Sequence, residues 1–195
     1  MASSISTDYL KKYWHEIPTA VRSFLLKALV CFLIWKIAYH LYIKPHRLLD
    51  VPLTIQTASN TQNILSLLYP QKIFSNSLVS TIDNSDFFGI SIFANGKKVI
   101  TILDPCNALE LYILYVLFII CLPSNWKRMV FFSVLGIIGI YLLNILRCTV
   151  LGMLNINRSL YVDFAHHYLF TMVVYIAIFA IWTLYINKSM SNETE

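Results

Sequence analysis

The sequence predicts an all-α polytopic membrane protein with about four transmembrane helices and a small extracytoplasmic loop domain that contains a β-hairpin. Composition is the first reason: 57% of the 195 residues are apolar and 13% are charged, against about 45–50% and about 25% in soluble domains. The second is that the apolar residues are concentrated in long runs flanked by basic residues. This composition excludes a disordered chain, a disulfide scaffold and a soluble nucleic-acid-binding protein, so no nucleic-acid partner is expected.

Four apolar segments are the predicted membrane spans, since a helix needs about 20 mainly apolar residues to cross a bilayer. They cover residues 23–43, 105–122, 128–154 and 165–187. The second is short and approaches the required length only when it is extended upstream to Asp104. The rest of the chain is an interfacial N-terminal segment (residues 1–22), a long loop (44–104) and a C-terminal tail (188–195).

Basic residues set the expected orientation, because the cytoplasmic flanks of membrane helices are enriched in Lys and Arg. They precede the first span, fill the turn between the second and third spans and follow the fourth: Lys11, Lys12, Arg22, Lys127, Arg128 and Lys188. With four spans, all these flanks lie on one side of the bilayer. We therefore expect both termini in the cytoplasm and the loop of residues 44–104 outside.

That loop is predicted to be structured. Two β-prone runs within residues 87–103 flank Asn95-Gly96, which is a strong signal for a type I′ hairpin turn. Residues 63–69 are compatible with a short helix on the membrane surface.

One of the four cysteines stands apart from the others. Cys31, Cys121 and Cys148 lie within apolar runs, where a thiol usually acts as a small hydrophobe. Cys106 follows Asp104-Pro105, a pattern typical of a helix start with Asp as N-cap and Pro in the first position. The free N–H groups of such a first turn favour a thiolate. The cysteines show neither CxxC nor zinc-site spacing, so neither a metal nor a cofactor is expected.

Three chemically complementary side chains are predicted to share one depth in the membrane. With a rise of about 1.5 Å per residue, Cys106, Arg147 and His166 lie roughly 25, 28 and 33 Å from the basic ends of their helices. In such a layer His166 is a candidate acid and base, and Arg147 a candidate stabiliser of a thiolate or oxyanion. Glu110 lies four residues after Cys106 and is predicted to hold Arg147 or Lys36.

Each of these residues also has a structural interpretation. A cysteine near a helix end is usually inert, and Arg147 can reach the headgroups by snorkelling. His166 and His167 are compatible with interfacial anchoring, and Glu110 with Lys36 forms a possible structural pair. Only their occurrence together at one depth favours a catalytic site. Cys148, next to Arg147, is a second thiol close to the same layer.

These elements resemble the exosortase/archaeosortase family. The resemblance rests on Asp-Pro-Cys106-Asn-Ala-Leu, on Asn144-Ile-Leu-Arg147 and on His166-His167-Tyr168, in this order and spacing. Many members carry Cys-Ser-Gly-Leu where this chain has Cys-Asn-Ala-Leu. The resemblance implies that Cys106 is the nucleophile, Arg147 the stabilising cation and His166 the proton-transfer residue. His167 is the alternative for the last role.

The resemblance also implies a membrane cysteine protease or transpeptidase without a cofactor. Its targets would be membrane-anchored proteins whose C-terminal sorting signal consists of a short motif, a transmembrane helix and a basic tail. An acyl-enzyme would pass the target to an acceptor of unknown identity. The chain looks like the small variants of Bacteroidetes-type bacteria, which places it in the inner membrane with its active site on the periplasmic side.

Two other classes of function remain open from the residues alone. A non-enzymatic membrane assembly or interaction protein would use the same polar residues to hold helices together. A small transporter or channel would line a path with Arg147, Glu110 and Lys36. The ionisable residues cluster at one end of the spans and do not run through the membrane, which disfavours a transporter or channel.

Overall fold

A computed structural model describes residues 18–80, 88–122 and 124–190. The predicted hairpin residue Phe87, most of the N-terminal segment and most of the C-terminal tail lie outside the described residues. The elements are the helices α2 (Thr19–Ala38), α3 (Lys44–His46), α4 (Asp50–Leu68), α5 (Leu109–Cys121), α6 (Trp126–Ile156), α7 (Val162–Phe164) and α8 (Phe170–Met190), the strands β1 (Phe74–Ser80), β2 (Phe88–Ala94) and β3 (Lys97–Leu103), the π-helices η1 (Tyr39–Ile43) and η3 (Ala165–Leu169), and the 3-10 turn η2 (Asp104–Cys106).

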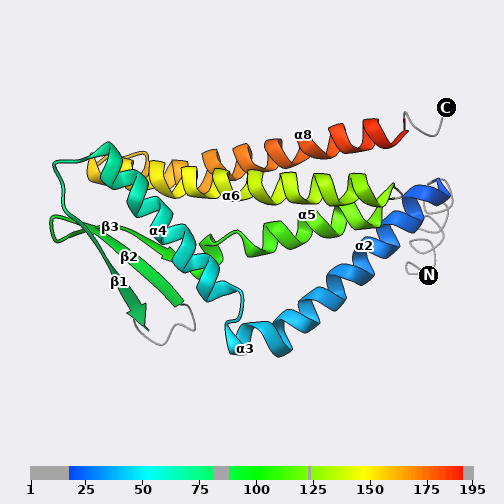
Figure 1. Ribbon diagram of the computed structural model, residues 1–195, viewed down its shortest axis with the longest axis horizontal. Coiled ribbons are helices and arrows are strands. Elements are labelled where there is room, and N and C mark those ends of the chain that lie inside the picture. Colours follow the sequence, from blue (N-terminus) through cyan, green and yellow to red (C-terminus); the bar gives the residue numbers. More distant parts are fainter. Residues whose placement is uncertain (1–17, 81–87, 123, 191–195) are drawn as a thin grey trace, which may run out of the picture.

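Helices make up one end of the molecule, and a small sheet lies at the other (Figure 1). Among the described residues, three helical stretches are long and apolar enough to cross a membrane: Val21–His46, Trp126–Ile156 and Val162–Ile186. The second predicted span forms only the 13-residue helix α5, which falls short of that length. Helices α5, α6 and α8 run side by side, while α2 diverges from them towards α3 (Figure 1).

The predicted helix start at Asp104 is wrong. Asp104–Cys106 forms a separate 3-10 turn without a side-chain cap, and Ala108 adopts a φ of 64° before α5 begins. The physical reason is Asn107, whose side-chain oxygen accepts the N–H of Leu109 at 2.8 Å and so caps α5 two residues later. Cys106 is therefore not in the first turn of α5, and it does not share a helical face with Glu110.

The predicted hairpin is confirmed over the described residues of β2 and β3. Its turn residues Asn95 and Gly96 both have positive φ, 51° and 76°, as a type I′ turn requires. β1 pairs antiparallel with β2 and completes a three-stranded sheet, which the sequence analysis missed because Phe74–Ser80 is rich in Ser and Asn.

Helix α4 is much longer than the short helix predicted at residues 63–69. Its buried residues repeat every three or four positions and form one face: Asp50, Thr54, Thr57, Ala58, Thr61 and Leu65. Ala58 belongs to an apolar cluster with Ile90 and Ile92 of β2 and Cys148 of α6. Helix α4 thus joins the sheet to the helical bundle (Figure 1).

A second apolar core lies between α5, α6 and α8. Tyr115 and Tyr185 are fully buried in it, and the Tyr115 hydroxyl donates a hydrogen bond of 2.8 Å to the carbonyl of Phe132. The ring of Tyr115 lies against Gly136, where a Cβ atom would overlap it. The close approach of α5 and α6 therefore requires glycine at this position.

We predict that Gly136→Ala destabilises the protein by about 2–3 kcal/mol, since the Tyr115 ring has no room to give way. The thermal unfolding midpoint in detergent measures the effect. Gly139→Ala is the matched control on the same helix, because its Cβ would meet only Ile181 Cδ1 at 3.9 Å. Equal midpoints for the two variants would contradict this packing.

We predict that Ala108→Gly stabilises the protein by about 0.5–1 kcal/mol, because a left-handed conformation is costly for a residue with a Cβ. The same thermal measurement tests this. Ala180→Gly, in the exposed interior of α8, is the control and should cost about 1 kcal/mol. A loss of stability in Ala108→Gly would contradict the conformation of the α5 start.

Candidate active site

A small cavity of about 90 Å³ brings together the three residues that the sequence analysis singled out. Cys106 reaches it from η2, Arg147 from α6 and His166 from η3. Cys106 and His166 are half-buried, and Cys148 lines the same cavity from α6. A thiol, a guanidinium and an imidazole from three separate elements therefore face one space.

The contact between Arg147 and His166 shows which side chain donates the hydrogen bond and which accepts it. Nη2 of Arg147 lies 3.2 Å from Nε2 of His166. A guanidinium only donates hydrogen bonds, so Nε2 is the acceptor and carries no proton in this arrangement. The imidazole can therefore accept a proton at Nε2 once the hydrogen bond from Arg147 is released. His166 lies in the π-helical turn η3, a helix type that is frequent at functional sites.

His167 does not reach this cavity. It is exposed and absent from the cavity wall, although its ring packs edge-on against His166 with centroids 4.7 Å apart. Of the two histidines, His166 is the one that lines the cavity with Cys106 and Arg147.

Asn144 holds the turn that carries Cys106. It is buried, and its amide nitrogen donates a hydrogen bond of 2.9 Å to the main-chain carbonyl of Cys106. Because residues three apart share a helical face, Asn144 and Arg147 point the same way from α6. The Asn-x-x-Arg spacing therefore serves two purposes, one residue positioning the turn and the other facing the cavity.

Asp104 anchors the other side of the same turn. Its carboxylate oxygens accept the hydroxyl of Thr54 at 3.1 Å and the N–H of Phe88 at 3.0 Å. Burial raises the pKa of the Asp104 carboxyl above its usual value, and the charge of Asp50 adds to this, while the two hydrogen bonds oppose it. Asp104 thus joins η2 to both α4 and β2.

Asn107 completes the anchoring, and the sequence analysis missed its role. It is 2% exposed, and its amide nitrogen donates to the Asp50 carboxylate at 3.1 Å while its oxygen caps α5. The signal that was available is the row of polar residues Asp50, Thr54, Thr57 and Thr61 along one face of α4. Such a polar stripe predicts a hydrogen-bonded contact rather than a plain surface helix.

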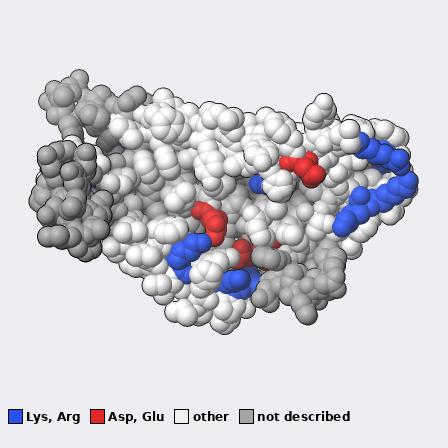
Figure 2. Space-filling view, turned by 180° about the vertical axis from the view of Figure 1, so that it is seen from behind, with Lys and Arg blue, Asp and Glu red and all other residues white. Residues whose placement is uncertain are grey.

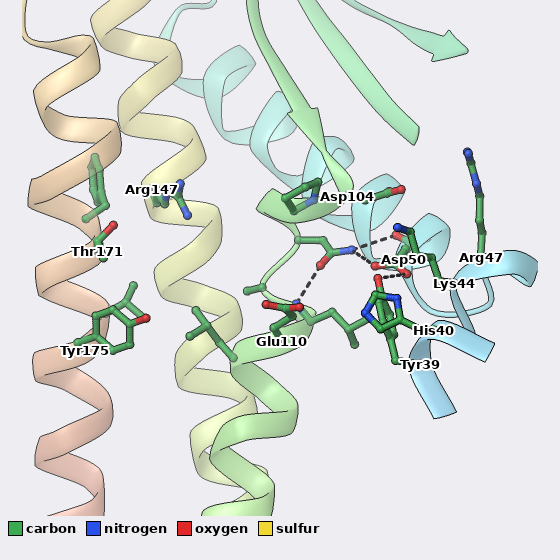
Figure 3. A pocket seen from close by; sticks show the side chains of 17 residues that line it. Tyr39, His40, Lys44, Arg47, Asp50, Asp104, Glu110, Arg147, Thr171 and Tyr175 are labelled. Carbon is green, nitrogen blue, oxygen red and sulfur yellow. Dashed lines mark hydrogen bonds between the residues drawn. The ribbon is translucent and has the colours of Figure 1, made fainter. Parts of the chain in front are cut away.

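A larger pocket of about 430 Å³ adjoins this site, and Arg147 lines both spaces. In Figure 3, Arg147, Thr171 and Tyr175 lie on one side of it, and Asp50, Asp104 and Lys44 lie on the other. Figure 2 shows a group of acidic and basic side chains near the middle of a largely uncharged face, with further charged side chains towards one end. The pocket therefore combines a charged wall from α3 and α4 with an apolar wall from α8.

Glu110 takes part in an ion pair across the helices. Its Oε1 lies 2.7 Å from Nζ of Lys36 on α2. Of the two partners considered for Glu110, the structure shows Lys36 and not Arg147. The pair attaches α2 to the start of α5, beside the larger pocket that Glu110 also lines.

We predict that Glu110→Gln lowers the thermal midpoint by about 2–4 °C at most, because the side chains of Lys36 and Glu110 are 34% and 69% exposed and such an ion pair contributes up to about 1 kcal/mol. The exchange variant Lys36→Glu/Glu110→Lys should recover most of the loss. If the exchange is no more stable than Glu110→Gln alone, the pair does not hold α2 to α5.

We predict that Asn144→Leu costs about 1–3 kcal/mol, since the carbonyl of Cys106 loses its donor in a buried place. The exposed Asn155 on the same helix provides the control, and Asn155→Leu should change stability by less than about 0.5 kcal/mol. Chemical denaturation in detergent measures both. Similar values for the two variants would show that the bond to Cys106 does not matter for stability.

The comparison with known protein families identifies the chain. The family model described as transmembrane exosortase matches residues 18–184. The chain therefore belongs to the transmembrane exosortase family. The match covers the N-terminal half as well, where the sequence analysis found no motif. No curated protein and no solved structure matches the chain.

Proposed function

We propose that this exosortase-family protein is a membrane cysteine protease or transpeptidase that cleaves C-terminal sorting signals of exported proteins. The observation that carries the proposal is the cavity shared by Cys106, Arg147 and His166. Family membership supports the class of enzyme, and the cavity supports the choice of residues.

The proposed reaction uses each side chain in one role. When the Arg147 guanidinium turns from Nε2 of His166 to the carbonyl oxygen of the target, Nε2 takes the proton of the Cys106 thiol, and the thiolate attacks that backbone carbonyl. Arg147 stabilises the negative oxygen of the tetrahedral intermediate. When the C–N bond breaks, His166 returns the proton to the leaving amine, and a thioester remains on Cys106. Attack on the thioester by an acceptor amine gives transfer, and attack by water gives hydrolysis.

The larger pocket is the proposed place of the target segment next to the cleaved bond. Its apolar side is formed by Phe170, Val174 and Tyr175, and its charged side includes Lys44 and Asp104. A sorting signal changes at this point from a polar motif to an apolar helix, so it requires a mixed surface of this kind. Because Arg147 borders both spaces, a segment in the pocket lies beside Cys106.

The proposed orientation follows from the positive-inside rule. The site faces the periplasm at the outer edge of the inner membrane, with both termini in the cytoplasm. The basic tail of the target then stays on the cytoplasmic side, as its own charges require.

We predict the following for a target with a short motif, an apolar helix and a basic tail, taken from the same organism and co-expressed with the enzyme. Cys106→Ala abolishes cleavage, and Arg147→Ala and His166→Ala each reduce the rate by at least about 100-fold. Immunoblotting of the target, with the mature form separated from the precursor, measures the rate.

His167→Ala is the matched control, because this exposed residue does not line the cavity, and cleavage should change by less than about threefold. Undiminished cleavage in Cys106→Ala would refute the enzyme and favour an assembly protein. Loss of cleavage in His167→Ala but not in His166→Ala would exchange the roles of the two histidines.

A further inference from the structure

A second thiol lies on the wall of the proposed active site. Cys148 and Cys106 both line the 90 Å³ cavity, together with Arg147 and His166. Both thiols are free in this structure. Cys106 also packs against the apolar cluster to which Cys148 belongs, so the two side chains are neighbours.

The two thiols differ in access. Cys148 is 3% exposed and belongs to the apolar cluster under the sheet, whereas Cys106 is half-buried and packs against the edge of that cluster. A dissolved oxidant can therefore meet Cys106 but not Cys148. Cys148 is placed to react only with something already attached to Cys106.

We propose that Cys106 and Cys148 form a reversible disulfide, with Cys148 acting as the resolving thiol when Cys106 reacts with a low-molecular-weight disulfide. The disulfide is a modification site in the wall of this cavity. That the disulfide switches the enzyme off rests on the proposed function of Cys106 as nucleophile.

The exchange is balanced in two steps. The Cys106 thiolate attacks one sulfur of the oxidant, which forms a mixed disulfide and releases the other sulfur as a thiolate. The released thiolate takes up the proton that Cys106 lost. Cys148 then attacks Sγ of Cys106 and gives its own proton to the second half of the oxidant, which leaves as a thiol. Two protein thiols are oxidised, and one external disulfide is reduced to two thiols.

The arrangement has a chemical consequence for the site. A lone reactive thiol in an oxidising compartment proceeds to sulfenic and then to irreversible sulfinic acid. A neighbouring thiol intercepts the first product and keeps the cysteine recoverable by a reductant. A reductant can reach this bond only through the half-buried sulfur of Cys106, since Cys148 is buried.

The other two cysteines must be removed before the test. Cys31 and Cys121 contact each other between α2 and α5, at the opposite end of α5 from Cys106, and they would give a second cross-link. The test protein is therefore the full chain in detergent with Cys31→Ala and Cys121→Ala.

The protein is treated with 2-hydroxyethyl disulfide and analysed by intact mass and by mapping of the joined peptides. The expected result is a loss of two hydrogen atoms, a peptide that links Cys106 to Cys148, and a fall of at least about tenfold in maleimide labelling of Cys106 that dithiothreitol reverses. Cys148→Ala and Cys148→Ser should instead retain the mixed disulfide on Cys106. Two variants are used because a hydroxyl in the apolar cluster can itself disturb the fold.

A persistent mixed disulfide in the protein that keeps Cys148 would overturn the inference, as would the absence of any reaction at Cys106. Target cleavage by the reduced protein is measured separately. If cleavage persists in Cys106→Ala although the cross-link forms in the parent, the proposed function fails and the disulfide site stands. If cleavage needs Cys106 but no cross-link forms, the disulfide site fails alone.

Discussion

The hydrogen bond from Asn144 to the carbonyl of Cys106 is the contact on which the candidate site depends. The η2 turn is only three residues long and lies outside the regular helices. Side chains from other segments must therefore pair with its polar groups and fix its position. Asn144 donates from α6 to the carbonyl of Cys106. The side chains of Asp104 and Asn107 bind the turn and the segment after it to β2 and α4. Together these bonds place the Cys106 thiol against the face of α6 that carries Arg147.

The sheet and α4 support the turn that carries Cys106. The sheet packs on α4, and Cys148 of α6 completes the apolar cluster between them. Asp104 accepts the N–H of Phe88, so the first residue of β2 is bound to the turn that carries the thiol. The sheet therefore supports the site instead of merely covering the end of the bundle.

Much of the fold could be predicted from the sequence, because the strongest signals are long and local. The apolar runs predicted the three long helices, and Asn95-Gly96 predicted the hairpin turn. The start of α5 could not be predicted in the same way. Asp104-Pro105 is a strong local signal for a helix start, but the bonds of Asn107 to Asp50 and Leu109 override it. A contact across 57 residues leaves no trace in local propensity.

In the site, too, some features could be predicted from local sequence and others depend on contacts between distant segments. The depths along the helices predicted one shared layer for Cys106, Arg147 and His166. The structure brings all three to one cavity, although Cys106 lies in η2, outside α5. The choice between His166 and His167 depends on the rotation of η3, whose π-helical winding differs from that of an ordinary helix. Beyond that layer, Asp50 and Thr54 lie in a segment of α4 where no helix was predicted.

The most direct test of the central claim is the alkylation rate of Cys106 in membranes by a maleimide that cannot cross the bilayer, with Cys106 as the only cysteine. The account predicts rapid labelling from the outside, at least about tenfold faster than in Arg147→Ala and His166→Ala, since only the thiolate reacts. His167→Ala should label at the parent rate. An unreactive Cys106, or a rate indifferent to Arg147 and His166, would contradict the claim that these three residues act as one unit.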